Sequence, residues 1–136
     1  MEQPDREEHL SPTDTFVAFV KAFNARDVDA VYACFSSKVR AQYPKVEVEG
    51  FLERAQTVGS RMVGWVYSEK DVTDGVAALM VRVKTIPSFE WGADISLITF
   101  VWEAGEWHID EWVSVDGEDQ LELPVRAFPV RTEPGW

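Results

Sequence analysis

The chain has 136 residues, of which 46% are hydrophobic and 12% aromatic, so it is long enough for one globular domain and too apolar for a disordered protein. Its 24 acidic and 13 basic residues give a formal net charge of −11. Because nucleic-acid binding needs clustered Lys and Arg side chains, this balance argues against a nucleic-acid partner.

Residues 1–10 are polar and charged, and they lack the apolar stretch of a signal peptide, so we expect a flexible acidic arm. No later stretch is apolar over the length that a membrane span needs, which argues against a membrane partner. The single cysteine, Cys34, excludes an internal disulfide and is typical of a reducing compartment. We therefore expect a cytoplasmic protein.

A folded domain is predicted over residues 11–116, and it begins with two amphipathic helices. Ser11 is a good N-cap and Pro12 suits the first helical position. Apolar residues then follow at the i, i+3, i+4 and i+7 spacing of one helical stripe, at Phe16, Phe19, Val20 and Phe23. Asn24-Ala25-Arg26 is predicted to end this helix, and Asp27 to cap a second one with a similar stripe.

The segment 36–43 is short and polar and is closed by Pro44, so we predict an irregular or briefly extended link. A third, shorter helix is expected over Gly50–Ser60, with Gly59 as its terminator. From Met62 the hydrophobic period changes from 3.6 to 2, which is typical of strands. The predicted strands are 62–72, 76–86, 93–103 and 106–115.

Two turns organise these strands into antiparallel hairpins. Thr73-Asp74-Gly75 predicts the first turn and Ala104-Gly105 the second. After residue 116 the repeated Leu-Pro-Val-Arg and Phe-Pro-Val-Arg sequences forbid a helix, so residues 117–136 are predicted to form an extended tail over this domain or a neighbouring chain. Helices followed by antiparallel strands predict an α+β fold with the helices packed on one sheet face.

Two stretches resemble the NTF2-like superfamily, also described as SnoaL-like or as the cystatin-like cone. They are FVAFVKAFNARDVDAVYACF at Phe16–Phe35 and EAGEWHIDEW at Glu103–Trp112. The resemblance covers about residues 12–116 and implies a strongly curved sheet that wraps the long helix and leaves a pocket. It also implies a function among isomerases, dehydratases, cyclases and small-ligand binders, and a homodimer formed through the convex sheet face.

Pairing the last two strands across a two-residue turn predicts which residues face the pocket. This register places Ile98 opposite Glu111 and puts Phe100, Trp102 and Trp107 on one face, with Trp112 on the other. Glu111 then interrupts that face, and a carboxylate among aromatic rings suits a general acid or base. Glu111 also fits a solvated position at the mouth of the cone or a pair with an arginine, and a turn one residue longer would reverse the assignment. His108 and Asp110 would point outward as surface residues.

The ligand-binding residues expected in this pocket come from both layers of the fold, and they are Tyr32, Trp65, Ser96, Phe100 and Trp107. No His or Cys cluster has the spacing of metal ligands, and no glycine-rich phosphate loop occurs, so neither a metal nor a cofactor is predicted. The leading hypothesis is a protein that binds a small apolar ligand in the cone. The alternatives are a cofactor-independent isomerase, dehydratase or cyclase that uses Glu111, and a dimeric interaction module.

Overall fold

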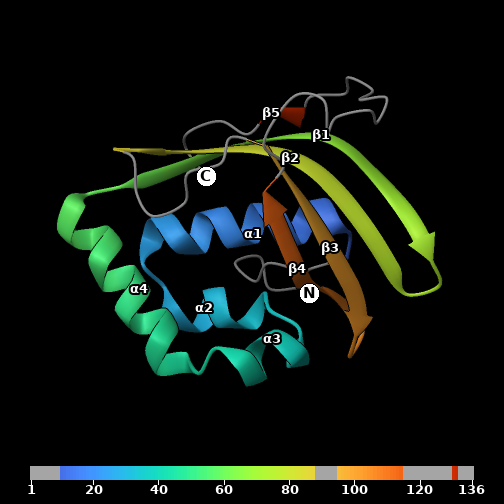
Figure 1. Cartoon of the computed structure of the whole chain (residues 1–136), viewed down its shortest axis with the longest axis horizontal. Coiled ribbons are helices and arrows are strands. Elements are labelled where there is room, and N and C mark those ends of the chain that lie inside the picture. The colour runs from blue at the N-terminus through green and yellow to red at the C-terminus, as the bar shows by residue number, and fades with distance from the viewer. Residues whose placement is uncertain (1–9, 88–94, 115–129, 132–136) are drawn as a thin grey trace, which may run out of the picture.

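The computed structural model describes residues 10–87, 95–114 and 130–131. Most of the predicted N-terminal arm, the loop 88–94 and most of the predicted tail lie outside the described residues. All four helices lie on one side of a curved antiparallel sheet, as expected from the order of elements (Figure 1). Among the described residues no helix is long and apolar enough to cross a membrane.

The first two helices, α1 (Pro12–Ala25) and α2 (Val28–Ala33), begin where the sequence predicts. The Asp14 amide donates a hydrogen bond to Ser11 Oγ, and the Ala30 amide donates one to the Asp27 carboxylate. These side chains satisfy amide groups that have no partner inside the helix. Between the helices, Arg26 adopts a left-handed conformation with φ of 57° and ends α1. Both capping predictions are confirmed.

The next segment differs from its prediction. The expected link contains a helix, α3 (Ser37–Gln42), capped by Ser36. The following helix, α4 (Lys45–Val58), starts directly after Pro44 and five residues before the predicted start at Gly50. Its buried residues, Val48, Leu52 and Ala55, likewise begin before Gly50. Gly59 ends α4 with φ of 70°, as predicted.

The sheet has the strand order β4-β3-β2-β1-β5. Its strands are β1 (Arg61–Thr73), β2 (Val76–Ile86), β3 (Ile95–Glu103), β4 (Glu106–Ser114) and β5 (Val130–Arg131). Ala104 and Gly105 both have positive φ, which is the requirement of the predicted two-residue turn between β3 and β4. The short β5, from the predicted tail, pairs antiparallel with β1 at Trp65 and Val66.

The inside of the cone is filled by α1. Phe16, Phe19 and Phe23 project from α1 and are at most 2% exposed, as are Ile98 and Phe100 on the sheet. At Gly64 the sheet approaches so closely that an added Cβ would lie 2.7 Å from Phe16 Cζ. Gly64 is therefore required by packing and not by a turn. At Gly64, α1 and the sheet are therefore in direct contact.

A β-bulge in β4 changes the predicted register of the last hairpin. Phe100 pairs with Ile109, as predicted, but Thr99 pairs with Glu111 and Ile98 with Trp112, so Asp110 is the extra residue. A bulge of this kind moves every following side chain to the other face of the strand. The predicted pairing of Ile98 with Glu111 is therefore wrong.

The outer side of β4 contacts the segment that joins α2 to α3. Phe35 forms a parallel bridge with Ile109. The Ser36 amide donates to the Ile109 carbonyl at 2.8 Å, and the Ile109 amide donates to the Cys34 carbonyl at 2.7 Å. These two bonds fix the start of α3 against the strand.

Candidate functional site

A cavity of about 540 Å³ lies beside the filled interior, between β4 and the helices α2, α3 and α4. This volume falls within the range of about 300–1,000 Å³ that is usual for small-molecule sites. Its lining residues are Phe19, Val31, Phe35, Val39, Gln42, Tyr43, Glu47, Val48, Phe51, Arg54, Ile109, Asp110, Glu111 and Trp112. The cavity therefore belongs to the edge of the sheet and not to its centre.

Aromatic side chains form much of the apolar wall. The Phe19 ring lies 6.2 Å from the Phe35 ring and 5.3 Å from the Trp112 ring, measured between centroids. Val31 and Ile109 are buried beside them. Trp112 reaches this position because the bulge turns it towards the helices, where it packs on α1. The bulge thus places an indole ring where the sequence predicted a carboxylate.

Polar groups surround the apolar wall. Gln42, Tyr43, Glu47, Arg54 and Glu111 are exposed and lie at the rim of the cavity. Their side chains remain in contact with water, so charges are tolerated there without the cost of full burial. The site has an apolar floor and a polar opening, the arrangement that is usual for small-molecule sites.

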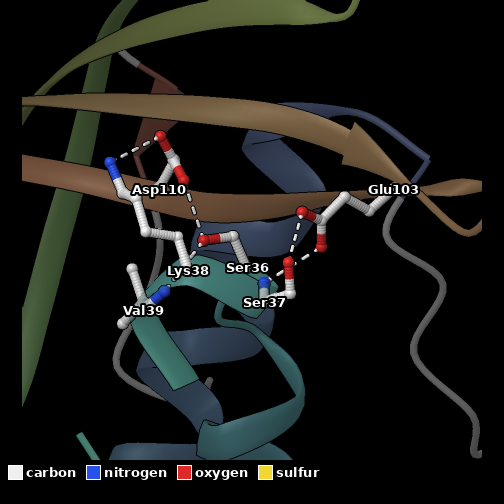
Figure 2. Close-up of polar contacts among 6 residues, drawn as sticks. All are labelled: Ser36, Ser37, Lys38, Val39, Glu103 and Asp110. Atoms are coloured by element: carbon white, nitrogen blue, oxygen red, sulfur yellow. Dashed lines mark hydrogen bonds and ion pairs between the residues drawn. The ribbon is translucent and has the colours of Figure 1, made fainter. Parts of the chain in front are cut away.

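Asp110, the bulged residue, is the least exposed carboxylate of the cavity, with a side chain that is 20% exposed. Its Oδ1 accepts a hydrogen bond from Ser36 Oγ at 2.8 Å, and its Oδ2 lies 3.2 Å from Lys38 Nζ. Figure 2 shows both contacts joining β4 to the first turn of α3. The carboxylate is thus held in one position at the edge of the apolar wall.

A second carboxylate holds the same end of α3. The Ser37 amide and hydroxyl donate to the two Glu103 carboxylate oxygens, each at 3.0 Å, while Ser36 Oγ accepts from the Val39 amide at 3.3 Å (Figure 2). No residue of α3 itself is buried. These polar contacts, which we call the α3 clamp (Ser36, Ser37, Lys38, Glu103 and Asp110), therefore fix one wall of the cavity.

Glu111 occupies a position different from the predicted one. It lines the cavity, but it is exposed and does not sit among the aromatic residues of the concave face. Glu111 is therefore not the buried carboxylate among aromatic rings that would suit a general acid or base, and the alternative of a solvated position fits it better. Its catalytic role stays a prediction that only its location at the rim supports.

The predicted ligand-binding residues are not brought together in the cavity. Phe100 and Ser96 are 0% and 2% exposed inside the cone. Trp107 packs against Trp102, with ring centroids 5.3 Å apart, at the turn between β3 and β4. Trp65 lies on the opposite face of β1 from Gly64, beneath the Arg82 guanidinium.

Tyr32 lies on α2 next to Val31, which lines the cavity, but Tyr32 is not itself among the described lining residues. Its hydroxyl donates to the Arg40 carbonyl at 3.2 Å and so links α2 to α3. The residues that do line the cavity come from all four helices and from β4, and those on α3 and in the first turn of α4 lie in stretches that were not predicted to be helical. Of the residues that the sequence singles out, Glu111 does line the cavity, and so does Asp110, which was expected at the surface.

His108 is buried, with 6% exposure, so its assignment as a surface residue is wrong. Its two ring nitrogens lie 3.2 Å from the Ala33 and Glu103 carbonyl oxygens. The imidazole thereby joins the end of α2 to the hairpin and is not placed in the cavity. Among residues 10–87, 95–114 and 130–131, no group of three or more His, Cys, Asp and Glu side chains is arranged to hold a metal ion.

Comparison with known proteins identifies the fold. No protein-family model matches the sequence, and no curated protein matches it. A domain of unknown function with a cystatin-like fold from Nostoc punctiforme is 18% identical, with a TM-score of 0.55 over 78% of this chain and 76% of that one. This similarity, together with the architecture, confirms the predicted α+β NTF2-like cone.

Two further solved structures share the fold. A SEC-C motif containing protein from Rhodopseudomonas palustris is 14% identical, with a TM-score of 0.59 over 80% of this chain and 82% of that one. A protein from Thiobacillus denitrificans, provisionally named a calcium/calmodulin-dependent protein kinase type II association domain, is 13% identical, with a TM-score of 0.57 over 81% of this chain and 99% of that one. At such identities the similarity concerns the fold alone.

Proposed function

We propose that the protein binds a small, largely apolar molecule in the cavity between β4 and the helices α2, α3 and α4. The observation that carries this proposal is an aromatic and aliphatic wall around a volume of about 540 Å³. Binding would remove apolar surface of both ligand and wall from water, which contributes roughly 25 cal/mol per Å². The α3 clamp supports the proposal because it holds the wall in place before a ligand arrives.

The test is a titration with N-phenyl-1-naphthylamine, a neutral aromatic compound whose fluorescence rises in apolar surroundings. We expect saturable binding to one site. Val39→Trp fills the cavity from α3 and should weaken binding by at least about tenfold. Val58→Trp, at an exposed valine at the end of α4 that does not line the cavity, is the matched control and should bind as the unchanged protein does. Equal binding by both variants would place the probe elsewhere and reject the site.

Acid–base catalysis in the same cavity is the second candidate, and the position of Asp110 favours it. Asp110 is a partly buried carboxylate whose orientation is fixed by Ser36, whereas Glu111 lies exposed at the rim. An isomerase or cyclase needs a base that removes a proton next to a carbonyl group. The assay is deuterium exchange into 2-tetralone in heavy water, followed by NMR. Faster exchange that Asp110→Asn abolishes would support catalysis by Asp110, and loss with Glu111→Gln would support the sequence prediction instead.

Self-association through the convex sheet face is a third candidate. Ile95, Leu97 and Val101 alternate with the buried residues of β3 and are half-buried on the face away from the helices. Light scattering at micromolar concentration tests this homodimer. A monomer there would reject it, and a dimer that Leu97→Asp dissociates would support it.

A further inference from the structure

We propose that the ligand of this cavity carries a cationic amine on its apolar body. This inference rests on the proposed function, because it specifies the chemical class of the molecule that the same cavity binds. It follows from two features of the lining residues, namely the sign of their charges and the number of aromatic rings.

The charged lining residues are mainly acidic. Three carboxylates, Glu47, Asp110 and Glu111, line the cavity, against one guanidinium, Arg54, in the described part of the chain. Lys38 lies close by and is paired with Asp110, so the local acidic excess rests on Glu47 and Glu111, both at the rim. The chain as a whole carries a net charge of −11, so its field adds to this local excess and repels anions.

The apolar wall also favours a cation. Phe19, Phe35, Phe51 and Trp112 line this wall, and the exposed Tyr43 lies at the rim. The face of an aromatic ring carries partial negative charge and attracts an ammonium group within about 6 Å of its centre. A carboxylate ligand would meet the same rings without this attraction and would meet the rim acids with repulsion. The aromatic rings and the carboxylates are independent features, and they select the same class of ligand.

The experiment compares three compounds with one apolar body: 2-(2-naphthyl)ethylamine, 2-(2-naphthyl)ethanol and 2-naphthylacetate. Each competes with N-phenyl-1-naphthylamine for the full-length protein, at low salt and at about 0.3 M salt, where charges on the surface are largely screened. We expect the amine to bind about three- to tenfold more tightly than the alcohol at low salt, and the acetate to bind most weakly. High salt should reduce both differences.

Single substitutions at the rim then identify the groups responsible. Glu47→Gln and Glu111→Gln each remove one exposed carboxylate, so both variants should fold, and each should lower the amine-to-alcohol preference by about two- to fivefold. Glu53→Gln is the matched control, because Glu53 is an exposed acid on α4 that does not line the cavity. It should leave the preference unchanged.

The outcomes separate this inference from the function on which it rests. Equal affinities for the three compounds, or the tightest binding by the acetate, would overturn the amine inference and leave the binding function intact. A preference for the amine that Glu53→Gln reduces as much as Glu111→Gln would also overturn it, since the effect would then reflect net charge alone. If the probe binds but no compound displaces it, the amine inference alone fails, and if the probe itself does not bind, both proposals fail.

Discussion

The interior of the cone and the edge where α3 meets β4 are held by different kinds of contact. In the interior, Phe16, Phe19 and Phe23 of α1 are almost fully buried and belong to the same core as the buried sheet residues. At the edge, no residue of α3 is buried, and the helix is attached through the α3 clamp. Close packing therefore holds the interior, while polar contacts hold one wall of the cavity for which ligand binding is proposed.

Shortening one aromatic side chain in each region should produce the largest difference in the free energy of unfolding. Phe16→Ala in the filled interior should lower the free energy of unfolding by about 3–5 kcal/mol, because the space it leaves cannot close. Phe51→Ala, at the half-buried wall of the cavity, should cost only about 1–2 kcal/mol, since water already reaches that site. Urea denaturation measures both, and equal losses would contradict the distinction.

Adding a methyl group tests how tightly the interior is filled. Gly64→Ala would bring Cβ to 2.7 Å from Phe16 Cζ and 2.9 Å from its Cε2, so we expect a loss of about 1–3 kcal/mol of stability. Gly50→Ala is the matched control within α4, where the nearest atom lies 3.7 Å away at Arg54. Because alanine favours helices, that variant should gain up to about 1 kcal/mol. The denaturant midpoint should fall for Gly64→Ala and rise for Gly50→Ala.

A smaller effect is expected where the α3 clamp is opened. Ser36→Ala removes both the cap of the Val39 amide and the donor to Asp110, which should cost about 1–2 kcal/mol. Hydrogen exchange should accelerate at the Ser37 and Val39 amides while the amides of β2 keep their protection. Thr57→Ala, which removes an exposed hydroxyl bonded within α4, is the control and should change neither quantity. Uniform acceleration would show that α3 does not open separately.

The smallest effect is expected at Lys45, which pairs with Asp29 on the surface. The hydrogen bond to Asp29 raises the pKa of the Lys45 ammonium. Any stabilisation is therefore complete at neutral pH and is lost only as the pH rises through the folded-state pKa. Since both side chains are at least half exposed, Lys45→Met should not shift the urea midpoint measurably at neutral pH. Lys38→Met, whose partner Asp110 is only 20% exposed, should produce the larger shift.

Local signals in the sequence predicted most of the fold. Ser11 and Asp27 cap helices through their own side chains, and Ala104-Gly105 forms its turn within the hairpin. Such features depend on neighbours in the sequence, which is why they could be identified there. In contrast, α3 has no apolar stripe, and the contacts that hold it come from Glu103 and Asp110, more than sixty residues away.

The site was predicted wrongly for a related reason. The apolar alternation of β4 at Trp107 and Ile109 breaks at Asp110-Glu111 before Trp112, and this break fits either an acid on the apolar face, as predicted, or the bulge at Asp110 that the structure shows. One extra residue exchanges the faces of Glu111 and Trp112, so an error in one position altered the whole assignment. His108 was misplaced because its burial depends on the end of α2, which covers it.

The bridge between Phe35 and Ile109 has a consequence for how the protein behaves in a crowded solution. β4 is the last strand on its side of the sheet, and such a strand can pair with strands of other molecules and so start aggregation. The bonds from Ile109 to Cys34 and Ser36 occupy the outward amide and carbonyl groups at the middle of this strand. The chain thus protects its own open edge with the same short segment that leads into the cavity wall.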